Sequence, residues 1–288
     1  MLIGEAIAQG SADLKYAGIK TPGLDASLLL AHILKTDRTK LMARETDDLS
    51  EEESELFCEF IERRVKGECT AYLIGKKEFR GLEFDINPFV LVPRPETETL
   101  VETAIDIIQN KLQDNSIANI LELCTGSGAV AISLKNEIHI CEITATDISS
   151  NALKTAIHNA EKLLGDNHID FFQGDLYSAL PSPLPAPFSL IISNPPYISS
   201  DEIQTLPMEV QNEPRLALDG GASGLEIITL IIKKAPDYLK QNGYLLLEAD
   251  PRQMKQITVL LEKNKFKNIQ LYKDLDGSNR IIGGRFEK

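Results

Sequence analysis

An Asn-Pro-Pro-Tyr tetrapeptide follows directly on the apolar run FSLII. Neither Pro195 nor Pro196 has a backbone N–H, and both have a fixed φ, so the stretch presents rigid carbonyl acceptors without competing main-chain donors. Asn194 adds a side-chain oxygen, and Tyr197 can cover a flat group. These residues suit a planar NH2 group that donates one hydrogen to Asn194 and the other to the Pro195 carbonyl. If that nitrogen attacks an electrophile it gains positive charge, and the acceptors then bind it more strongly, as catalysis requires.

Two prolines can also do no more than end a strand. At average composition, however, this tetrapeptide is expected by chance in only on the order of one chain in a thousand of this length. The catalytic interpretation is therefore favoured. It needs no separate base, because the attacked nitrogen becomes acidic enough to release a proton to water.

A loop with two glycines follows an earlier strand-like run, in LELCTGSGAVAISL. Gly126 and Gly128 lie at the turn into a helix, where glycine lets the backbone approach a ligand and the helix start offers unpaired N–H groups. With Ala131 they satisfy the dinucleotide pattern G-x-G-x-x-A, and Asp147 lies at a suitable distance to hold ribose hydroxyls. Glu122 argues against a nicotinamide dinucleotide, because it places an acid close to where the pyrophosphate would lie.

S-adenosylmethionine fits these residues better, since it has an amino-acid end, a sulfonium, a ribose and an adenine but no phosphate. Asp147 ends the next strand-like run, where it can accept hydrogen bonds from two ribose hydroxyls. Asp175 can meet the amino edge of the adenine, and Leu176 can pack on the ring. A single acid at a strand end often only caps the following helix. The prediction of an S-adenosylmethionine site therefore rests on the order of all these residues along the chain.

The elements that must position these residues alternate along the chain. Strand-like runs NILELC, CEITATD, IDFFQ, FSLIIS and GYLLLE are separated by helical stretches such as SSNALKTAIHNAEKLL and LEIITLIIKKAPDYLKQ. This alternation predicts a parallel sheet with helices on both faces. Two further runs, KNIQLYKDL and NRIIGGRFEK, flank DGS and predict a terminal antiparallel pair. Ligands of such sheets bind beyond the carboxyl ends of the strands, which is where the residues above lie.

The chain changes character near residue 75. Before it, the clearest helix begins at Ser50, with Glu53 three residues later to complete a capping box. One face of this helix is predicted to hold Leu56, Phe57, Phe60 and Ile61. After it, two short alternating runs around Gly81 predict a β-hairpin between two domains. The predicted boundaries are a helical domain at 1–73, a hairpin linker at 74–93 and an α/β domain at 94–288.

Composition and net charge limit which kinds of partner are expected for the protein. The 288 residues are 43% hydrophobic and 25% charged, as in a soluble globular protein. No apolar run has the length of a membrane span and the start lacks the pattern of a signal peptide, so the cytoplasm is the expected location and a membrane is not an expected partner. The four cysteines and four histidines show no metal-ligand spacing. A net charge of −13 makes nucleic acid a disfavoured partner.

Several segments together resemble the protein-(glutamine-N5) methyltransferases of the PrmC/HemK type, which modify peptide-chain release factors. They are YLIGKKEFRGLEF, LVPRPETETLVE, LELCTGSGAVAISL, ATDIS, GDLYSAL, SNPPYI and EVQNEPRLALDGG, and they run in order from about Ala71 to the C-terminus. NPPY alone is shared with adenine-N6 and guanine-N2 methyltransferases. PRPETE and the EP loop are not general features of those enzymes, so the resemblance is specific.

The resemblance implies an α/β protein of the class I S-adenosylmethionine-dependent methyltransferase type, which is Rossmann-like, with a seven-stranded, mostly parallel sheet. It also implies a small helical N-terminal domain for substrate recognition and, as substrate, the glutamine of a release-factor Gly-Gly-Gln loop. The cofactor would contact Cys124, Thr125, Gly126, Ser127, Gly128 and Asp147, and the predicted cofactor site also includes Glu122, Asp175, Leu176 and Asn194. The glutamine would be held by Asn194, Pro195, Pro196 and Tyr197.

This chain departs from the family pattern at three places. Many relatives have glycine at the position of Cys124, some have tryptophan at that of Leu176, and the segment LLLEADPRQ differs from the usual form. Two other functions stay open at this point. One is a nucleic-acid amino methyltransferase, which the net charge disfavours; the other is an inactive module that only binds ribosomal factors, against which the intact NPPY argues.

Overall fold

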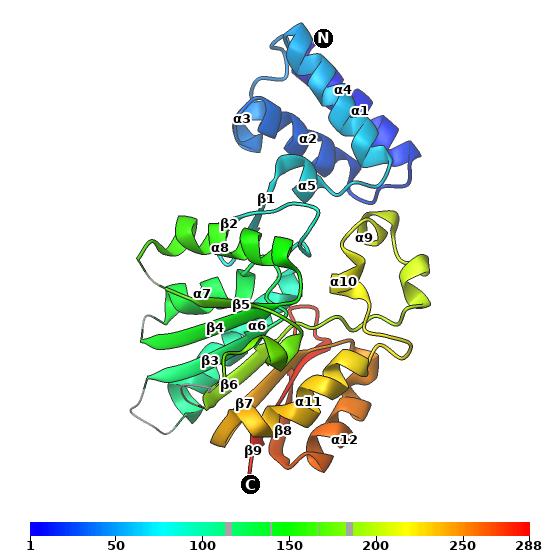
Figure 1. The fold of residues 1–288 in the computed structure, drawn as a ribbon. Coiled ribbons are helices and arrows are strands. Elements are labelled where there is room, and N and C mark those ends of the chain that lie inside the picture. Colours follow the sequence, from blue (N-terminus) through cyan, green and yellow to red (C-terminus); the bar gives the residue numbers. More distant parts are fainter. Residues whose placement is uncertain (113–116, 139, 167, 183–186) are drawn as a thin grey trace. The chain divides into compact units, whose positions relative to one another are not determined.

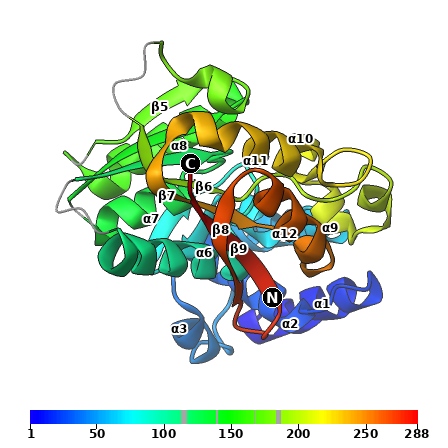
Figure 2. The same ribbon diagram turned by 90° about the horizontal axis from the view of Figure 1, so that it is seen from below.

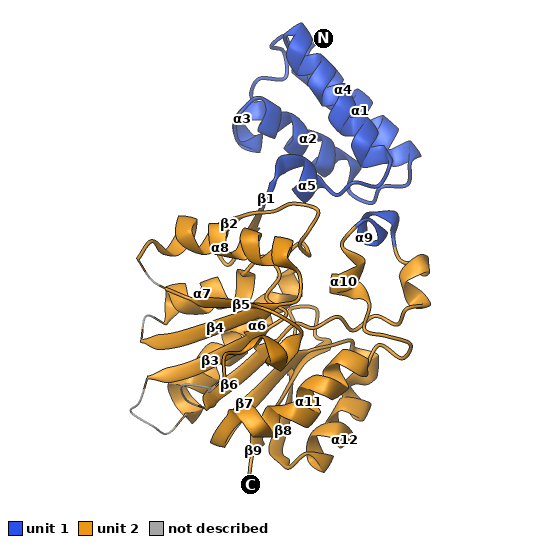
Figure 3. Ribbon diagram, in the orientation of Figure 1, with its two compact units in different colours: residues 1–76, 207–212 blue, residues 77–206, 213–288 orange. Residues whose placement is uncertain are grey.

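The computed structural model describes residues 1–112, 117–138, 140–166, 168–182 and 187–288. It divides the chain into two compact units, shown as ribbons in Figure 1 and coloured separately in Figure 3. Unit 1 is Met1–Lys76 together with Pro207–Asn212, and unit 2 is Lys77–Leu206 together with Glu213–Lys288. No pattern in the sequence predicts that the short segment Pro207–Asn212 belongs with the N-terminal helices.

Unit 1 is helical. Its helices are α1 (Ile3–Tyr16), α2 (Pro22–Ile33), α3 (Arg38–Met42), α4 (Glu51–Val65), α5 (Thr70–Ile74) and α9 (Met208–Gln211). The predicted capping box of α4 is confirmed, because Ser50 Oγ accepts from the Glu53 amide at 3.2 Å and the Glu53 carboxylate accepts from the Ser50 amide at 2.8 Å. Phe57 lies in the core, but Leu56 is 40% exposed and does not share its face, since adjacent helical residues point about 100° apart.

A buried arginine explains why Pro207–Asn212 joins the helices of unit 1. Arg64, on α4, is only 3% exposed, and its Nε donates to Asp25 Oδ2 at 2.8 Å. The same guanidinium pairs with Glu209, on α9. Since a buried guanidinium is costly unless its charge is paired, Glu209 holds α9 against α4, while Asp25 joins α2 to the same guanidinium.

Unit 2 is built on one seven-stranded sheet. Its strands are β3 (Ala118–Leu123), β4 (Cys141–Asp147), β5 (Asp170–Gln173), β6 (Phe188–Ser193), β7 (Leu239–Glu248), β8 (Phe266–Lys273) and β9 (Asn279–Phe286). They are ordered β5-β4-β3-β6-β7-β9-β8, with β9 antiparallel to both of its neighbours and the others parallel. The predicted parallel sheet with a terminal antiparallel pair is therefore confirmed. A separate two-stranded sheet, β1 (Lys76–Phe79) and β2 (Leu82–Asp85), turns at Gly81, whose φ is +75°.

Helices cover both faces of this sheet. Figures 1 and 2 show α6 (Pro95–Asp106), α7 (Ala129–Glu137) and α8 (Ser150–Leu164) on one face, and α11 (Glu226–Tyr238) and α12 (Met254–Lys263) on the other. The shorter elements are η1 (Ile107–Lys111), η2 (Leu176–Ala179), η3 (Glu202–Thr205), α10 (Arg215–Leu218) and η4 (Pro251–Gln253). In the described part of the chain, no helix is long and apolar enough to cross a membrane.

The boundary between α11 and β7 lies earlier than the sequence pattern predicts. The helical pattern continues to Gln241, but the helix ends at Tyr238 and the chain is extended from Leu239. Pro236 stands in the last helical turn and lacks the N–H that would extend the hydrogen-bond ladder. Leu239 is buried and pairs with Phe188 of β6, so tertiary packing decides the boundary.

Candidate active site

Strand register brings the predicted site residues to one edge of the sheet. The strand order reverses between β3 and β6, with β4 and β5 beyond β3 and β7 beyond β6. Leu123, the last residue of β3, pairs with Ser193, the last residue of β6. Cys124, Asp147 and Asn194 therefore leave neighbouring strands side by side, at the switch point where open α/β sheets bind ligands.

A cavity of about 330 Å³ opens at this edge, within unit 2. The predicted residues on its wall are Glu122, Cys124, Thr125, Gly126, Ser127, Asp147, Asp175, Leu176, Asn194 and Pro196. Gly128, Pro195 and Tyr197 are not among the wall residues. The wall also includes residues that the sequence analysis missed, among them Phe89, Arg94, Thr97, Thr146 and Leu216.

Gly128 serves packing rather than the cavity wall. Its φ is +82°, and a Cβ there would lie 2.8 Å from Ile132 Cδ1 and 3.2 Å from Ala156 Cβ. The glycine thus allows α7 to pack closely on α8. Gly126 differs, because its φ is +59° but nothing lies within 4 Å of where its Cβ would be. Its amide instead donates to Asp147 Oδ2 at 2.9 Å, which ties the loop to the end of β4.

Glu122 occupies the anion-binding end of α7. Its Oε2 accepts from the Thr125 hydroxyl at 2.6 Å and from the Ala131 amide at 3.2 Å, one of the unpaired N–H groups of the first helical turn. A pyrophosphate would need those same N–H groups, so the dinucleotide alternative does not fit. Burial, with a smaller contribution from the charge of Asp147, raises the pKa of Glu122 to about 8. A cation in the cavity would favour its ionised form.

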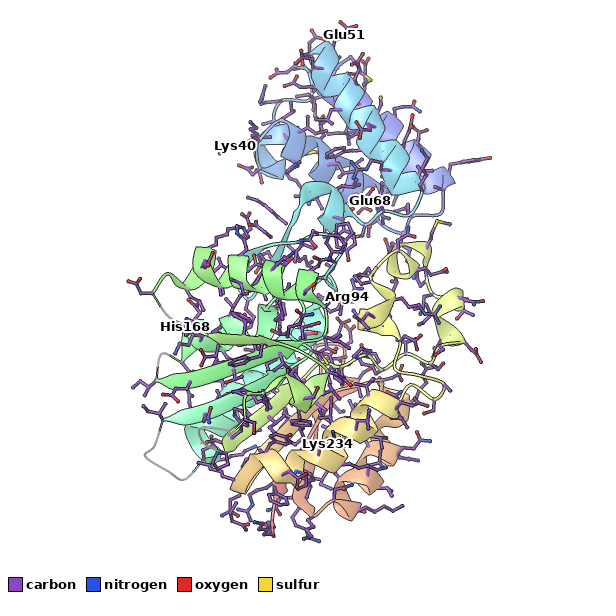
Figure 4. All side chains as sticks on the ribbon, viewed as in Figure 1. Lys40, Glu51, Glu68, Arg94, His168 and Lys234 are labelled. Atoms are coloured by element: carbon purple, nitrogen blue, oxygen red, sulfur yellow. The ribbon has the colours of Figure 1, made fainter. Side chains whose placement is uncertain are left out.

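The charges of the cavity wall suit a ligand that is cationic and carries no phosphate. Arg94, labelled in Figure 4, is paired with Glu213, and Arg215 Nη2 is paired with Asp219 Oδ2 at 3.0 Å. Among the described residues, these are the arginines of the wall, and each already has a carboxylate partner. The acids of the wall are Glu122, Asp147, Asp175 and Asp219. This set of donors and acceptors fits S-adenosylmethionine.

Two wall residues hold backbone conformations that favour glycine. Cys124 has a φ of 61° and Leu176 a φ of 48°, each at a cost of about 1 to 3 kcal/mol for a side chain without glycine's freedom. A glycine at position 124 would adopt this conformation without strain. Burial raises the pKa of the Cys124 thiol to about 12, with Asp147 adding to the rise, so the group stays protonated and is no nucleophile.

The NPPY residues leave two acceptors open. Asn194 Nδ2 donates to Thr97 Oγ1 at 3.1 Å, whereas within the described ranges its Oδ1 accepts no hydrogen bond. The Pro195 carbonyl likewise receives none from the part of the chain that the structure describes. These are the two acceptors that the sequence predicts for an NH2 group.

Tyr197 is anchored by the segment LLLEADPRQ, whose role the sequence did not explain. The Tyr197 hydroxyl donates to Glu248 Oε1 at 3.5 Å, and its carbonyl accepts from Gln253 Nε2 at 2.9 Å. Gln253 Nε2 also donates to the Gly224 carbonyl at 3.2 Å. The end of β7 and the residues just after it therefore hold Tyr197 of NPPY in place through these hydrogen bonds.

Two buried carboxyl groups make the stability of the protein depend on pH. Burial raises the pKa of Glu122 to about 8 and that of Glu248 to about 7, from an ordinary 4.5. Between roughly pH 5 and pH 8 the folded state holds protons that the unfolded chain has released, so the free energy of unfolding falls as pH rises. For Glu248 alone the effect is at most about 3 kcal/mol.

We expect urea unfolding of Glu248→Gln to depend less on pH than that of the wild type. Parallel curves for the two proteins would contradict this.

Comparison with known proteins agrees with this geometry. Residues 5–75 match the PrmC N-terminal domain family, and residues 98–219 match the methyltransferase small domain family. The chain is 40% identical to the release factor glutamine methyltransferase of Coxiella burnetii, over 92% of each chain. It is 38% identical to the protein of that name from Rhodopirellula baltica, over 92% of this chain and 90% of the relative. The chain belongs to the release factor glutamine methyltransferase family.

Membership of this family confirms the predicted class, a methyltransferase that uses S-adenosylmethionine. The fold agrees, because a methyltransferase structure from Pyrococcus furiosus matches 74% of this chain and 92% of its own with a TM-score of 0.53 at 18% identity.

The two motifs that made the resemblance specific, PRPETE and the EP loop, also meet in space. Arg94 of PRPETE pairs with Glu213 of the EP loop, which is 4% exposed and also accepts from the Val92 amide at 3.2 Å. This pairing holds the start of the wall segment 214–219.

Proposed function

We propose that this chain methylates the side-chain amide nitrogen of a glutamine in peptide-chain release factors. The observation that carries the proposal is the pair of open acceptors: Asn194 Oδ1, on a residue of the cavity wall, and the carbonyl of Pro195, which stands between the wall residues Asn194 and Pro196. The names of relatives at 38% and 40% identity support the release factor as substrate. The alternative of a nucleic-acid amino group is not favoured, because those relatives act on a protein by name and this chain has a net charge of −13.

The residues around the loop after β3 would hold the cofactor. When bound, S-adenosylmethionine supplies an electrophilic methyl group. Glu122 offers a buried carboxylate to its ammonium end, and Asp147 offers lone pairs to ribose hydroxyls. Asp147 Oδ1 already accepts from the Ser149 amide at 2.9 Å, which fixes the carboxylate in place while each oxygen keeps a further lone pair. Asp175 and Leu176 then remain for the adenine.

The NPPY residues would orient the substrate. Asn194 Oδ1 and the Pro195 carbonyl accept the two hydrogens of the glutamine NH2 group, so the nitrogen is held in one orientation. As this nitrogen gains positive charge during attack, both acceptors bind it more strongly than they bind the neutral amide. The proton then leaves to water. Tyr197, held at its hydroxyl and its carbonyl, would cover the flat amide.

Unit 1 would recognise the release factor. Its match to the PrmC N-terminal domain family over residues 5–75 supports a role apart from cofactor binding. A release factor acts in translation, so the cytoplasm is the location that follows from this substrate.

Labelling of purified substrates tests this function. Incubated with the enzyme and labelled S-adenosylmethionine, a release factor should accept one methyl group per chain, whereas duplex DNA and ribosomal RNA should accept none. Replacing the glutamine of the Gly-Gly-Gln loop by alanine should abolish labelling, because the amide nitrogen is then absent. Labelling that persists in this variant would place the methylated residue elsewhere.

A further inference from the structure

A buried asparagine of α8 contacts two segments that are far apart in the chain. Asn159 is 0% exposed. Its Oδ1 accepts from the Asp85 amide at 2.8 Å, and its Nδ2 donates to the Asp85 carbonyl at 3.1 Å and to the Ser127 carbonyl at 3.0 Å. Asp85 ends β2, and Ser127 belongs to the cofactor loop, residues 124–128, which follows β3. One side chain therefore joins the β-hairpin to the cofactor loop.

The partners of Asn159 fix the orientation of its amide. All three are backbone groups, and a backbone N–H can only donate while a carbonyl can only accept. Oδ1 must therefore face the Asp85 amide, and Nδ2 must face the two carbonyls. No titratable side chain takes part in these three contacts.

The contacts between α8 and the hairpin continue into the cavity wall. Asn87 Nδ2 donates to Thr155 Oγ1 at 2.8 Å, and Asn87 Oδ1 accepts from the Phe89 amide at 3.0 Å. Thr155 stands four residues before Asn159, so the two lie on the same face of α8. Residues 88–91, which follow directly, line the cavity. This face of α8 therefore fixes where that part of the wall begins.

The cofactor loop depends on support from its surroundings. Cys124 has a φ of 61°, and a residue other than glycine keeps such a conformation only where the surrounding structure holds it. From α8 the loop receives two contacts. One is the hydrogen bond of Asn159 to the Ser127 carbonyl, and the other is close packing, since a Cβ at Gly128 would lie 3.2 Å from Ala156 Cβ.

We propose that Asn159 is a positioning residue, which holds the cofactor loop in the conformation that binds S-adenosylmethionine and fixes the wall segment 88–91 relative to that loop. Asn159 is not itself among the residues of the cavity wall, so it acts through the groups that it binds. A loop that leaves its binding conformation for part of the time binds its ligand more weakly in proportion. The role toward the cofactor is independent of the methyl acceptor, whereas the role toward segment 88–91 rests on the proposed function, in which this part of the wall is left for the substrate.

Substitution of Asn159 tests the role toward the cofactor. Asn159→Ala removes all three hydrogen bonds and keeps a residue that favours helix. We expect the affinity for S-adenosylmethionine, measured by calorimetry on the folded protein, to fall at least about tenfold. Thermal melting shows whether the variant is folded. If it is not, Asn159→Ser, which leaves room for water beside a hydroxyl, should show the same loss.

Substitution of Thr155 tests the role toward the wall segment. Thr155→Val keeps the shape of the side chain and the hydrogen bonds of Asn159, but removes the acceptor of Asn87 Nδ2. The KM for the release factor should rise about fivefold, as for the loss of one buried hydrogen bond, while the affinity for S-adenosylmethionine stays at the wild-type value. Thr155→Ser keeps the hydroxyl and should restore the KM.

A control variant separates positioning from a general loss of stability. Leu261→Ala removes a side chain of α12 that is 0% exposed and outside the cavity wall. It should lower the melting temperature, because it leaves a cavity in the core, yet bind S-adenosylmethionine as the wild type does.

The outcomes distinguish this inference from the proposed function. Wild-type cofactor affinity in Asn159→Ala, or an equal loss of affinity in Leu261→Ala, would overturn the positioning role toward the cofactor. An unchanged KM in Thr155→Val would overturn the role toward segment 88–91. If the wild type itself transfers no methyl to any release factor, the proposed function fails, while calorimetry still decides the role of Asn159 toward the cofactor.

Discussion

Asn194→Ala should reduce methyl transfer by about 10²- to 10³-fold in single turnovers with saturating S-adenosylmethionine, the usual loss on removing one oriented group that binds developing charge. The substitution removes Oδ1, the open acceptor, and also the donor to Thr97 Oγ1. It leaves the loop after β3 untouched, including the hydrogen bonds of Glu122 to Thr125 and Ala131. Cofactor affinity, measured by calorimetry, should therefore change little.

A matched control is Asn110→Ala, which removes the side chain of an exposed asparagine outside the cavity wall. It should transfer methyl groups at the wild-type rate. Asn194→Ala with a wild-type-like rate would refute the role assigned to NPPY, despite the family to which the chain belongs. A large loss of cofactor affinity in Asn194→Ala would instead move Asn194 to the cofactor.

Asp147→Ala should weaken S-adenosylmethionine binding by about a hundredfold or more. Two charge-assisted hydrogen bonds to ribose would disappear, each worth roughly 1.5 to 3 kcal/mol. The carboxylate also accepts from the Gly126 and Ser149 amides, both at 2.9 Å, so its removal frees the cofactor loop as well. Calorimetry with purified protein measures the change directly.

The matched control for this variant is Asp170→Ala, at the exposed start of β5, which should bind the cofactor as the wild type does. Asp147→Asn separates the two losses, because an amide oxygen still accepts a hydrogen bond but no longer carries a charge. Unchanged affinity in Asp147→Ala, or tighter binding of NAD than of S-adenosylmethionine by the wild type, would refute the cofactor assignment.

Local chemistry made much of the fold and of the cavity predictable. Alternating strand and helix patterns predicted the parallel sheet, because the period of hydrophobic residues reports which side chains must be buried. In such a sheet the carboxyl ends of the strands meet at one edge, so Cys124, Asp147 and Asn194 could be placed together from sequence order alone. Pro195 and Pro196 could be predicted to offer backbone carbonyl acceptors with no N–H donor beside them, because proline lacks an N–H in any surroundings.

Only the tertiary structure decided the parts that depend on residues far apart in the chain. No pattern in the sequence names the partner of Asn194, which donates to Thr97 only because α6 packs on the sheet, and the Tyr197 hydroxyl donates to Glu248 only because β7 lies in register with β6. Arg94 and Glu213 are separated by more than a hundred residues. Neither PRPETE, which contains Arg94, nor the EP loop, which contains Glu213, shows by its own sequence that the two residues form an ion pair.

Packing also determined features that the sequence patterns missed or misplaced. The segment Pro207–Asn212 joins unit 1 because Glu209 pairs with the buried Arg64, a choice set by the cost of an unpaired buried charge. The helix α11 ends at Tyr238 because Leu239 finds a place in the core beside β6. Sequence periodicity reports which residues are to be buried, but which buried polar groups satisfy one another is settled only when distant elements come into contact.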